Sequence, residues 1–147
     1  MFNHLIKIDK ILLDPPNAQT IINGLERELT LFSKFFSSSH YNYSIDSVAY
    51  LDEDYPLLME EGISEAEVFL PIVCYIGEVF KKATNGEWEI KKNKKKEVIS
   101  IKGENGIYYD PYAPVQKILI NAHHSHDFQA VVESQLHPIN FQKVIQS

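Results

Sequence analysis

Hydrophobic residues recur at helical spacing in the first third of the chain. The positions follow one another four and three residues apart: Ala18, Ile22, Leu25, Leu29, Phe32 and Phe36. This spacing places their side chains on one stripe, so we expect one long amphipathic helix here. The polar run Ser37-Ser38-Ser39-His40 is expected to end it. The opening stretch HLIKIDKILL fits a strand and a helix equally well.

A second helix is predicted from about Ile45 to Glu61. Ser44 is a suitable N-cap, because its hydroxyl can accept a hydrogen bond from a backbone N–H of the first turn. Gly62 is expected to end the helix. Several acidic residues fall within this segment, so one face of the helix is expected to be acidic.

A third helix is predicted to start at Ser64, which together with Glu67 has the spacing of a capping box. Pro71 is expected to kink this helix or to mark a restart, since proline removes one backbone hydrogen bond. From Val68 to Phe80 the residues are apolar nearly all round, which indicates a helix surrounded by protein. We take this segment as the central helix of the fold.

The pattern changes to short strands after Asn85-Gly86. The expected strands are Glu87 to Ile90, Val98 to Lys102 and Ile107 to Tyr109. The lysine-rich segment between the first two is expected to form a loose turn. Asn105-Gly106 predicts a tight hairpin with positive φ at both central positions.

Two more helices are expected after the strands, over Val115 to about Asn121 and over Phe128 to Gln135. Helices, a short three-stranded antiparallel meander and further helices, in this order, predict an α+β fold. The meander is expected to pack on the central helix. The length of 147 residues fits one domain spanning residues 1–147.

Charge is distributed unevenly along the chain, whose formal net charge is −6. Nine acidic residues and no Lys or Arg occur from Asp46 to Glu78, whereas eight lysines occur from Lys81 to Lys102. An acidic helical surface would speed and orient association with a basic protein. The residues expected to form this surface are Asp46, Asp52, Glu53, Asp54, Glu60 and Glu61.

Glu78 is expected to be a buried polar residue, because it lies on the helix predicted to be enclosed. A buried carboxylate needs a hydrogen-bond donor. Trp88 or one of the tyrosines is expected to supply it, with Gly77 allowing close approach. Cys74 lies in an apolar run without a neighbouring base, which indicates a core cysteine and not a nucleophile.

The densest group of candidate metal ligands is His123, His124, His126 and Asp127. Imidazole and carboxylate are the usual ligands of zinc and related metals. Adjacent histidines on a helix point about 100 degrees apart, and the sequence contains no His-Glu-x-x-His pattern. We therefore expect polar residues that end a helix and no cofactor, with a metal site as the alternative interpretation.

The sequence shows none of the common nucleotide, hydrolase and redox signatures, which weakens the case for an enzyme. No apolar run is long enough for a membrane span, and a single cysteine suits a reducing cytoplasm, where we expect the protein. The lysine run, with Tyr108, Tyr109 and Tyr112 nearby, suits nucleic acid. The acidic total argues against that partner.

The stretch from Tyr75 to Ile90, YIGEVFKKATNGEWEI, resembles a pattern in small uncharacterised bacterial proteins. In that pattern a helix carrying Tyr-x-Gly-Glu is followed by Gly-x-Trp at the start of a sheet. The resemblance covers about a tenth of the chain and implies a helix-to-sheet junction around Gly77, Glu78, Gly86 and Trp88. It also implies an immunity protein or an accessory partner, and no reaction.

Three functions are open on the sequence alone. The one we expect is a non-catalytic domain that binds a basic protein, as an immunity-type inhibitor of a toxin would. The second is a metal-dependent enzyme that uses the segment from His123 to Asp127. The third is a self-associating structural subunit, in which the acidic block of one copy meets the lysine hairpin of another.

Overall fold

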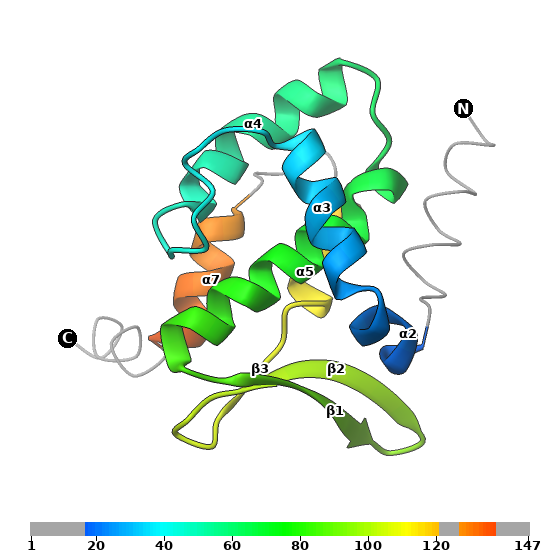
Figure 1. Cartoon of the computed structure of the whole chain (residues 1–147), viewed down its shortest axis with the longest axis vertical. Coiled ribbons are helices and arrows are strands. Elements are labelled where there is room, and N and C mark those ends of the chain that lie inside the picture. The colour runs from blue at the N-terminus through cyan, green and yellow to red at the C-terminus, as the bar shows by residue number, and fades with distance from the viewer. Residues whose placement is uncertain (1–16, 121–126, 138–147) are drawn as a thin grey trace.

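The computed structural model describes residues 17–120 and 127–137 of the chain. This part has the predicted α+β fold (Figure 1). In chain order the elements are α2 (Ala18–Asn23), α3 (Leu25–Phe35), α4 (Val48–Glu60), α5 (Glu65–Thr84), β1 (Glu87–Asn93), β2 (Lys96–Lys102), β3 (Tyr108–Tyr109), α6 (Ala113–Ile120) and α7 (Phe128–Leu136). The opening stretch from His4 to Leu13 lies outside the described residues.

The central helix is α5, as its sequence predicts. It packs against α3, α6 and α7 and against the two longer strands, and eleven of its residues are buried. Figure 1 shows the sheet on one side of α5 and α4 on the other. Because protein surrounds the helix on nearly all sides, its apolar residues do not need to keep to one stripe.

The start of α5 has the expected capping box. Ser64 Oγ accepts from Glu67 N at 3.3 Å, and Glu67 Oε2 accepts from Ser64 N at 3.0 Å. Pro71 lies inside α5, and the helix continues past it without the restart that we considered. Pro71 is itself buried, and the packing of apolar residues on both sides of it outweighs the loss of one backbone hydrogen bond.

The single long helix expected over residues 18–36 is divided at Gly24 into α2 and α3. Gly24 has φ −98° and ψ 9°, and its N–H donates to Ile21 O at 3.1 Å, so the chain makes a turn at this point. Glycine is a poor helix former, which explains why the break falls there. The prediction of one uninterrupted helix was wrong in this respect.

The second helix, α4, begins at Val48 and not at Ile45. Ser44 still acts at this end, because its Oγ accepts from Ser47 N at 3.1 Å. The intervening residues form tight turns in which each N–H bonds to the carbonyl three residues back, as Val48 N does to Ile45 O at 3.1 Å. These turns have the hydrogen-bond pattern of a 3₁₀ entry to the helix.

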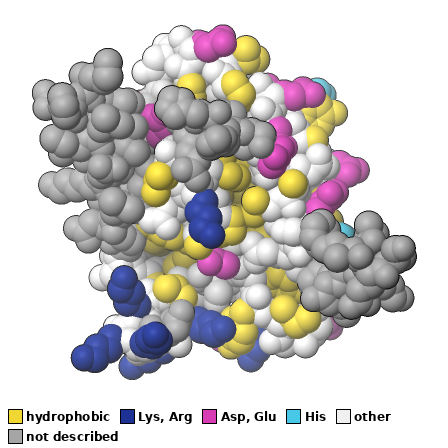
Figure 2. All heavy atoms as spheres, turned by 180° about the vertical axis from the view of Figure 1, so that it is seen from behind, with side chains coloured by type: hydrophobic (Ala, Val, Ile, Leu, Met, Phe, Trp, Pro, Cys, Tyr) yellow, Lys and Arg dark blue, Asp and Glu magenta, His cyan; other side chains and the backbone are white. Residues whose placement is uncertain are grey.

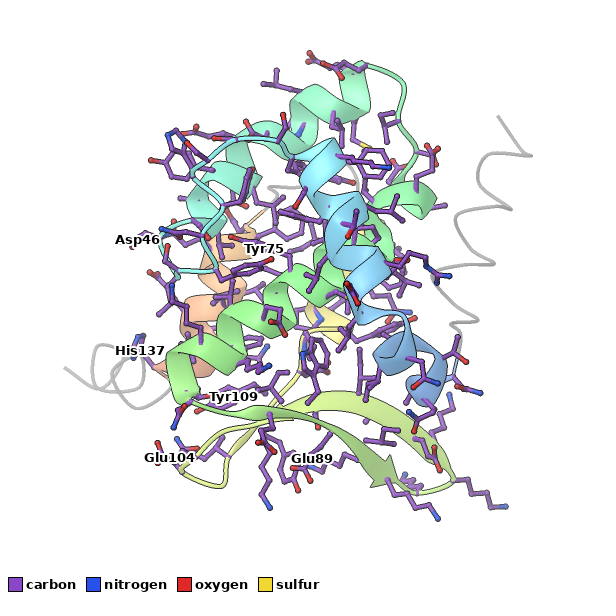
Figure 3. The ribbon with its side chains drawn as sticks, in the orientation of Figure 1. Asp46, Tyr75, Glu89, Glu104, Tyr109 and His137 are labelled. Carbon is purple, nitrogen blue, oxygen red and sulfur yellow. The ribbon has the colours of Figure 1, made fainter. Side chains whose placement is uncertain are left out.

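The three strands form an antiparallel sheet in the order β1-β2-β3. The face toward α5 carries the apolar side chains Trp88, Ile90, Ile99, Ile101 and Tyr109. Tyr109 stacks on Phe80 of α5 with ring centroids 5.4 Å apart, and Figure 3 shows Tyr109 between the sheet and the helix. The meander therefore packs on the central helix, as expected.

The lysine run does not form the loose turn that we expected. It lengthens β1 and β2 into a tight hairpin, in which Asn93 lies opposite Lys96. Lys94 has φ 61°, the left-handed conformation that a two-residue hairpin turn requires. Lysines tolerate these positions because both faces of the hairpin tip are exposed, and the strands pair through their backbones.

The second turn of the sheet is wider than the tight hairpin turn that was predicted at Asn105-Gly106. Gly103 N donates to Ile107 O at 2.8 Å and closes a loop of residues 103–107. Gly106 has φ 84°, whereas Asn105 does not have a positive φ. Asn105 instead accepts from Ile107 N through Oδ1 at 3.0 Å, so its side chain stabilises the loop.

Candidate protein-binding surface

The outward face of α4, together with the turn that leads into it, carries alternating acidic and apolar side chains. Its residues follow one another four and three positions apart: Asp46, Tyr50, Glu53, Leu57 and Glu60. We refer to these five residues as the α4 stripe. The opposite face of the helix is held in the core by Val48, Leu51 and Tyr55, none of which is more than 1% exposed. The helical period therefore points the α4 stripe toward solvent.

The two apolar members of the α4 stripe are accessible. Leu57 is 56% exposed and Tyr50 is 37% exposed. The His40 ring stacks on Tyr50, with centroids 4.1 Å apart. Protein interfaces concentrate their binding free energy in aromatic and aliphatic anchors of this kind, surrounded by polar groups. Our sequence reasoning missed both residues, although they share the spacing of the acids around them.

A groove of about 580 Å³ runs beside the α4 stripe, between the end of α3 and α4. Its apolar lining consists of Phe35, Phe36, Leu57, Leu58 and Ile63. Leu57 belongs both to the groove and to the stripe, so the two form one continuous surface. Asp54 and Glu61 also line the groove.

Two of the six acids expected on the binding surface are occupied within the protein. Asp52 accepts from the backbone N–H groups of Phe128 and Gln129 at 2.6 and 3.2 Å. Asp54 accepts from the Tyr41 hydroxyl at 2.7 Å. Burial and this hydrogen bond raise the pKa of Tyr41 well above its ordinary value, so the phenol keeps its proton.

The other four expected acids are exposed: Asp46, Glu53, Glu60 and Glu61. Asp52 therefore contacts α7, and Asp54 lies at the groove in contact with Tyr41; sequence position alone does not show which acids of α4 meet other elements. Asp46, Glu53 and Glu60 lie on one line, and Glu61 lies beside them at the groove.

The exposed acids of α4 and the lysines of the β1-β2 hairpin lie at opposite ends of the molecule. In Figure 1, α4 is at the top and the β1-β2 hairpin is at the bottom. Figure 2 shows most of the visible acidic side chains in the upper half and most of the lysines at the lower end. The hairpin end carries the exposed lysines Lys91, Lys92, Lys94, Lys95, Lys96 and Lys102. The acidic and basic segments of the sequence thus lie at two different ends of the folded molecule.

Glu78 is half-exposed and not buried as expected. Trp88 Nε1 donates to Glu78 Oε2 at 2.7 Å, so Trp88 is the donor among the candidates that we considered. Both side chains line a groove of about 430 Å³ bounded by α3, α5 and β1. Because Glu78 lines this groove, it is only partly buried, which is why the prediction of a buried carboxylate failed.

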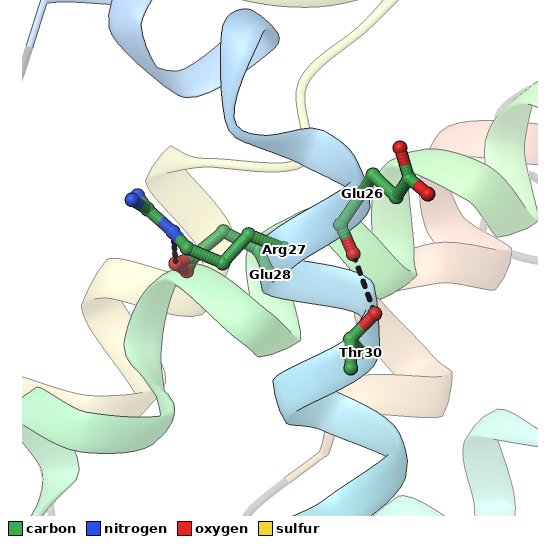
Figure 4. A network of polar contacts seen from close by, with 4 residues as sticks. All are labelled: Glu26, Arg27, Glu28 and Thr30. Atoms are coloured by element: carbon green, nitrogen blue, oxygen red, sulfur yellow. Dashed lines mark hydrogen bonds and ion pairs between the residues drawn. The ribbon is translucent and has the colours of Figure 1, made fainter.

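The buried carboxylate lies on α3 and not on α5. Glu28 is only 7% exposed, and its neighbour Arg27 approaches Oε1 through Nε at 3.7 Å (Figure 4). Burial raises the pKa of Glu28 above 4.5, and Arg27 partly opposes the shift. Glu28 precedes buried Phe32 by four residues, a spacing that places it on the core side of α3.

Glu28→Gln is expected to be more stable than the unmodified protein at pH 7, and this difference in stability should be smaller at pH 4.5. An acid whose folded-state pKa is raised contributes stability below its unfolded pKa and loses it as pH rises through the folded value. Glutamine does not titrate, so the advantage of the variant should grow as pH rises from 4.5. Urea unfolding at several pH values measures this difference.

Glu26→Gln is the matched control, because Glu26 is an exposed glutamate two positions away on the same helix (Figure 4). This control should leave the pH dependence of stability unchanged. If the difference in stability between Glu28→Gln and the unmodified protein did not change with pH, Glu28 would not be the acid whose pKa is raised by burial.

Cys74 is completely buried. Burial, followed by the nearby carboxylates of Glu28 and Glu78, raises the pKa of its thiol to about 12. At neutral pH the thiol is protonated and shielded from solvent, so it cannot act as a nucleophile. The interpretation of Cys74 as a core residue agrees with its position.

Most of the proposed metal cluster lies outside the described residues. This applies to His123, His124 and His126. Asp127 is described and lies at the start of α7. Within residues 17–120 and 127–137, no three His, Cys, Asp or Glu side chains are grouped as ligands of a metal ion.

Comparisons with known protein families, with curated proteins and with solved structures gave no significant match. None of the helices in the described part combines the length and the apolar character needed to span a bilayer. The surface of the molecule is therefore the basis on which its function can be argued.

Proposed function

We propose that the chain is a non-catalytic protein-binding domain and that the α4 stripe docks a basic protein. The observation that carries the proposal is the exposure of Tyr50 and Leu57 between acids on one helical line. Apolar anchors supply binding free energy when a partner excludes water from them. Acids around such anchors steer and orient a basic partner.

The partner would present Lys or Arg side chains around an apolar contact. Leu57 would be covered at the centre of the interface, where it also reaches the groove beside α3. Glu53 and Glu60 flank it along the stripe and would pair with the partner's cations at the rim. An immunity-type inhibitor of a basic toxin could act in this way, because covering the toxin's surface requires no catalytic group.

Site-specific photocrosslinking tests the docking surface. A photoreactive residue at position 57 should capture a basic protein from the native host extract. The control position is Ile107, which is 53% exposed and lies on the β2-β3 loop, away from α4. Capture of the same proteins from both positions would contradict a docking site on α4.

The captured partner is then purified and titrated against variants. Leu57→Ala should weaken binding roughly tenfold, because it removes the central anchor. Glu53→Gln should slow association and reduce its salt dependence. Lys95→Gln at the opposite end should change neither. A partner whose affinity is unaffected by Leu57→Ala would overturn the proposal.

Self-association is a second candidate, favoured by the separation of the acidic and basic ends. The α4 stripe of one copy could reach the lysine hairpin only of another copy, because the two surfaces of one molecule lie far apart (Figure 1). Such head-to-tail contacts generate open chains. Light scattering should then show assemblies at low salt that dissociate as salt rises. A monomer at low salt would exclude this function.

A further inference from the structure

The face of the sheet that points away from α5 carries a compact group of charged and aromatic side chains. Since Ile99 and Ile101 are buried against α5, the strand period places Ser100 and Lys102 on the outer face. The register places Glu89 opposite Ser100 on this face. Figure 3 shows Glu89 on the side of the sheet remote from α5.

Two lysines converge on one exposed aromatic ring in this group. Lys91 Nζ lies 4.6 Å and Lys102 Nζ lies 5.7 Å from the ring centroid of Tyr108. Tyr108 is 39% exposed. Both ammonium groups therefore lie over the ring in cation–π contacts, and a base that stacks on Tyr108 takes the place of these lysines.

The Lys91 side chain reaches across the outer face of the sheet from β1 to Tyr108 on β3. Lys91 lies opposite Val98 in the register. Tyr108 lies opposite Lys102. Ser100 lies between these two β2 positions on the same face, so a side chain reaching from Lys91 to the Tyr108 ring passes above Ser100. Ser100 is only 4% exposed although it lies on the outward face.

Two buried polar atoms on this face have no hydrogen-bond partner among the described residues. They are Ser100 Oγ and Glu89 Oε2. Unsatisfied buried polar atoms are costly, and a ligand that supplies the missing partners recovers that cost. Lys91 and Lys102 have long, flexible side chains that can move aside to admit such a ligand.

We propose that this outer face binds single-stranded nucleic acid, with a base stacked on Tyr108. Lys91, Lys102 and the lysines of the hairpin would contact the phosphates. Single-stranded nucleic acids are bound on exposed sheet faces by this combination of stacking ring and basic track. Ser100 and Glu89 would contact the edge of a base, since a carboxylate can accept from an exocyclic amino group.

The negative net charge does not oppose this binding. The acidic residues of the α4 stripe lie at the other end of the molecule (Figure 1), and salt screens charges over a Debye length of about 8 Å at physiological ionic strength. The local field at the hairpin is set by six lysines, which outnumber the neighbouring glutamates. This surface is separate from the α4 stripe, so the inference does not depend on the proposed function.

Fluorescence anisotropy with labelled single strands of about 12 nucleotides tests the proposal. RNA and DNA probes should bind at low salt, and affinity should fall as salt rises. Tyr108→Ala should weaken binding roughly tenfold or more, whereas Tyr108→Phe should bind like the unmodified protein. Lys91→Gln should lower the slope of log affinity against log salt by about 0.7.

The matched control is Lys117→Gln, which removes the same charge from an exposed position on α6. It should leave both affinity and slope unchanged. An equal loss of affinity in Lys117→Gln and Lys91→Gln would show that the protein attracts nucleic acid through its overall charge and not through this face, which would overturn the proposal. Absence of binding at low salt, equal affinity for duplex DNA, or unchanged affinity in Tyr108→Ala would do the same.

Discussion

Gly77→Ala is expected to lower the free energy of unfolding by about 2 kcal/mol. A Cβ at this position would overlap the six-membered ring of Trp88, which lies directly on the backbone of α5. The indole cannot retreat without losing the hydrogen bond from Nε1 to Glu78. Alanine is otherwise the better helix residue by about 1 kcal/mol. A loss of stability would therefore identify contact with the indole as the cause.

The double variant Gly77→Ala, Trp88→Ala separates this cause from others. Without the indole, the alanine at position 77 should become neutral or stabilising by up to about 1 kcal/mol. Urea unfolding followed by circular dichroism measures both backgrounds. In the single variant, fluorescence of Trp88, the only tryptophan in the chain, should also report a more solvated indole. Equal destabilisation in both backgrounds would exclude the contact.

Gly24→Ala is the matched control for a glycine-to-alanine change. A Cβ at Gly24 would meet chiefly the mobile end of the Arg27 side chain, at 3.2 Å. This contact can relax at little cost, so stability should change by less than about 0.5 kcal/mol. A comparable loss at both glycines would point to the backbone and not to Trp88.

Elements with strong local signals could be predicted from the sequence. The capping box of Ser64 and Glu67 and the apolar run after it located α5, because both signals act within a few residues. The boundaries of β1 and β2 could not be predicted, since the lysines of the hairpin pair through their backbones. Local polarity shows where side chains meet solvent and not where strands end.

The site could be predicted only in part, because its geometry depends on distant packing. The acidic character of α4 is visible in the sequence. That Asp52 is bonded within the protein while Glu53 is exposed depends on α7, which follows more than seventy residues later. For the same reason, the sequence did not show that Glu28 is buried and that Glu78 lies at a groove. Which of them is buried depends on how α3 crosses α5, and neither helix alone contains that information.

Asp52→Ala is expected to cost about 2 kcal/mol of folding stability. The carboxylate accepts from two backbone N–H groups in the first turn of α7. These N–H groups have no partner inside their own helix. The negative charge of the carboxylate is also attracted to the positive, N-terminal end of the helix dipole. Removing the carboxylate loosens α7 from α4, where Phe128 packs edge-on against Tyr55 with centroids 5.5 Å apart.

Asp52→Asn should lose about half as much, because the amide keeps one acceptor oxygen and turns a donor toward the second N–H. Hydrogen exchange should accelerate first at Phe128 and Gln129. The matched control is Glu53→Ala, which removes the adjacent, exposed carboxylate and should change stability by less than about 0.5 kcal/mol. If the α4 stripe docks a basic protein, Glu53→Ala weakens association without weakening the fold. Equal losses of stability at the two positions would contradict the role of Asp52 as the cap of α7.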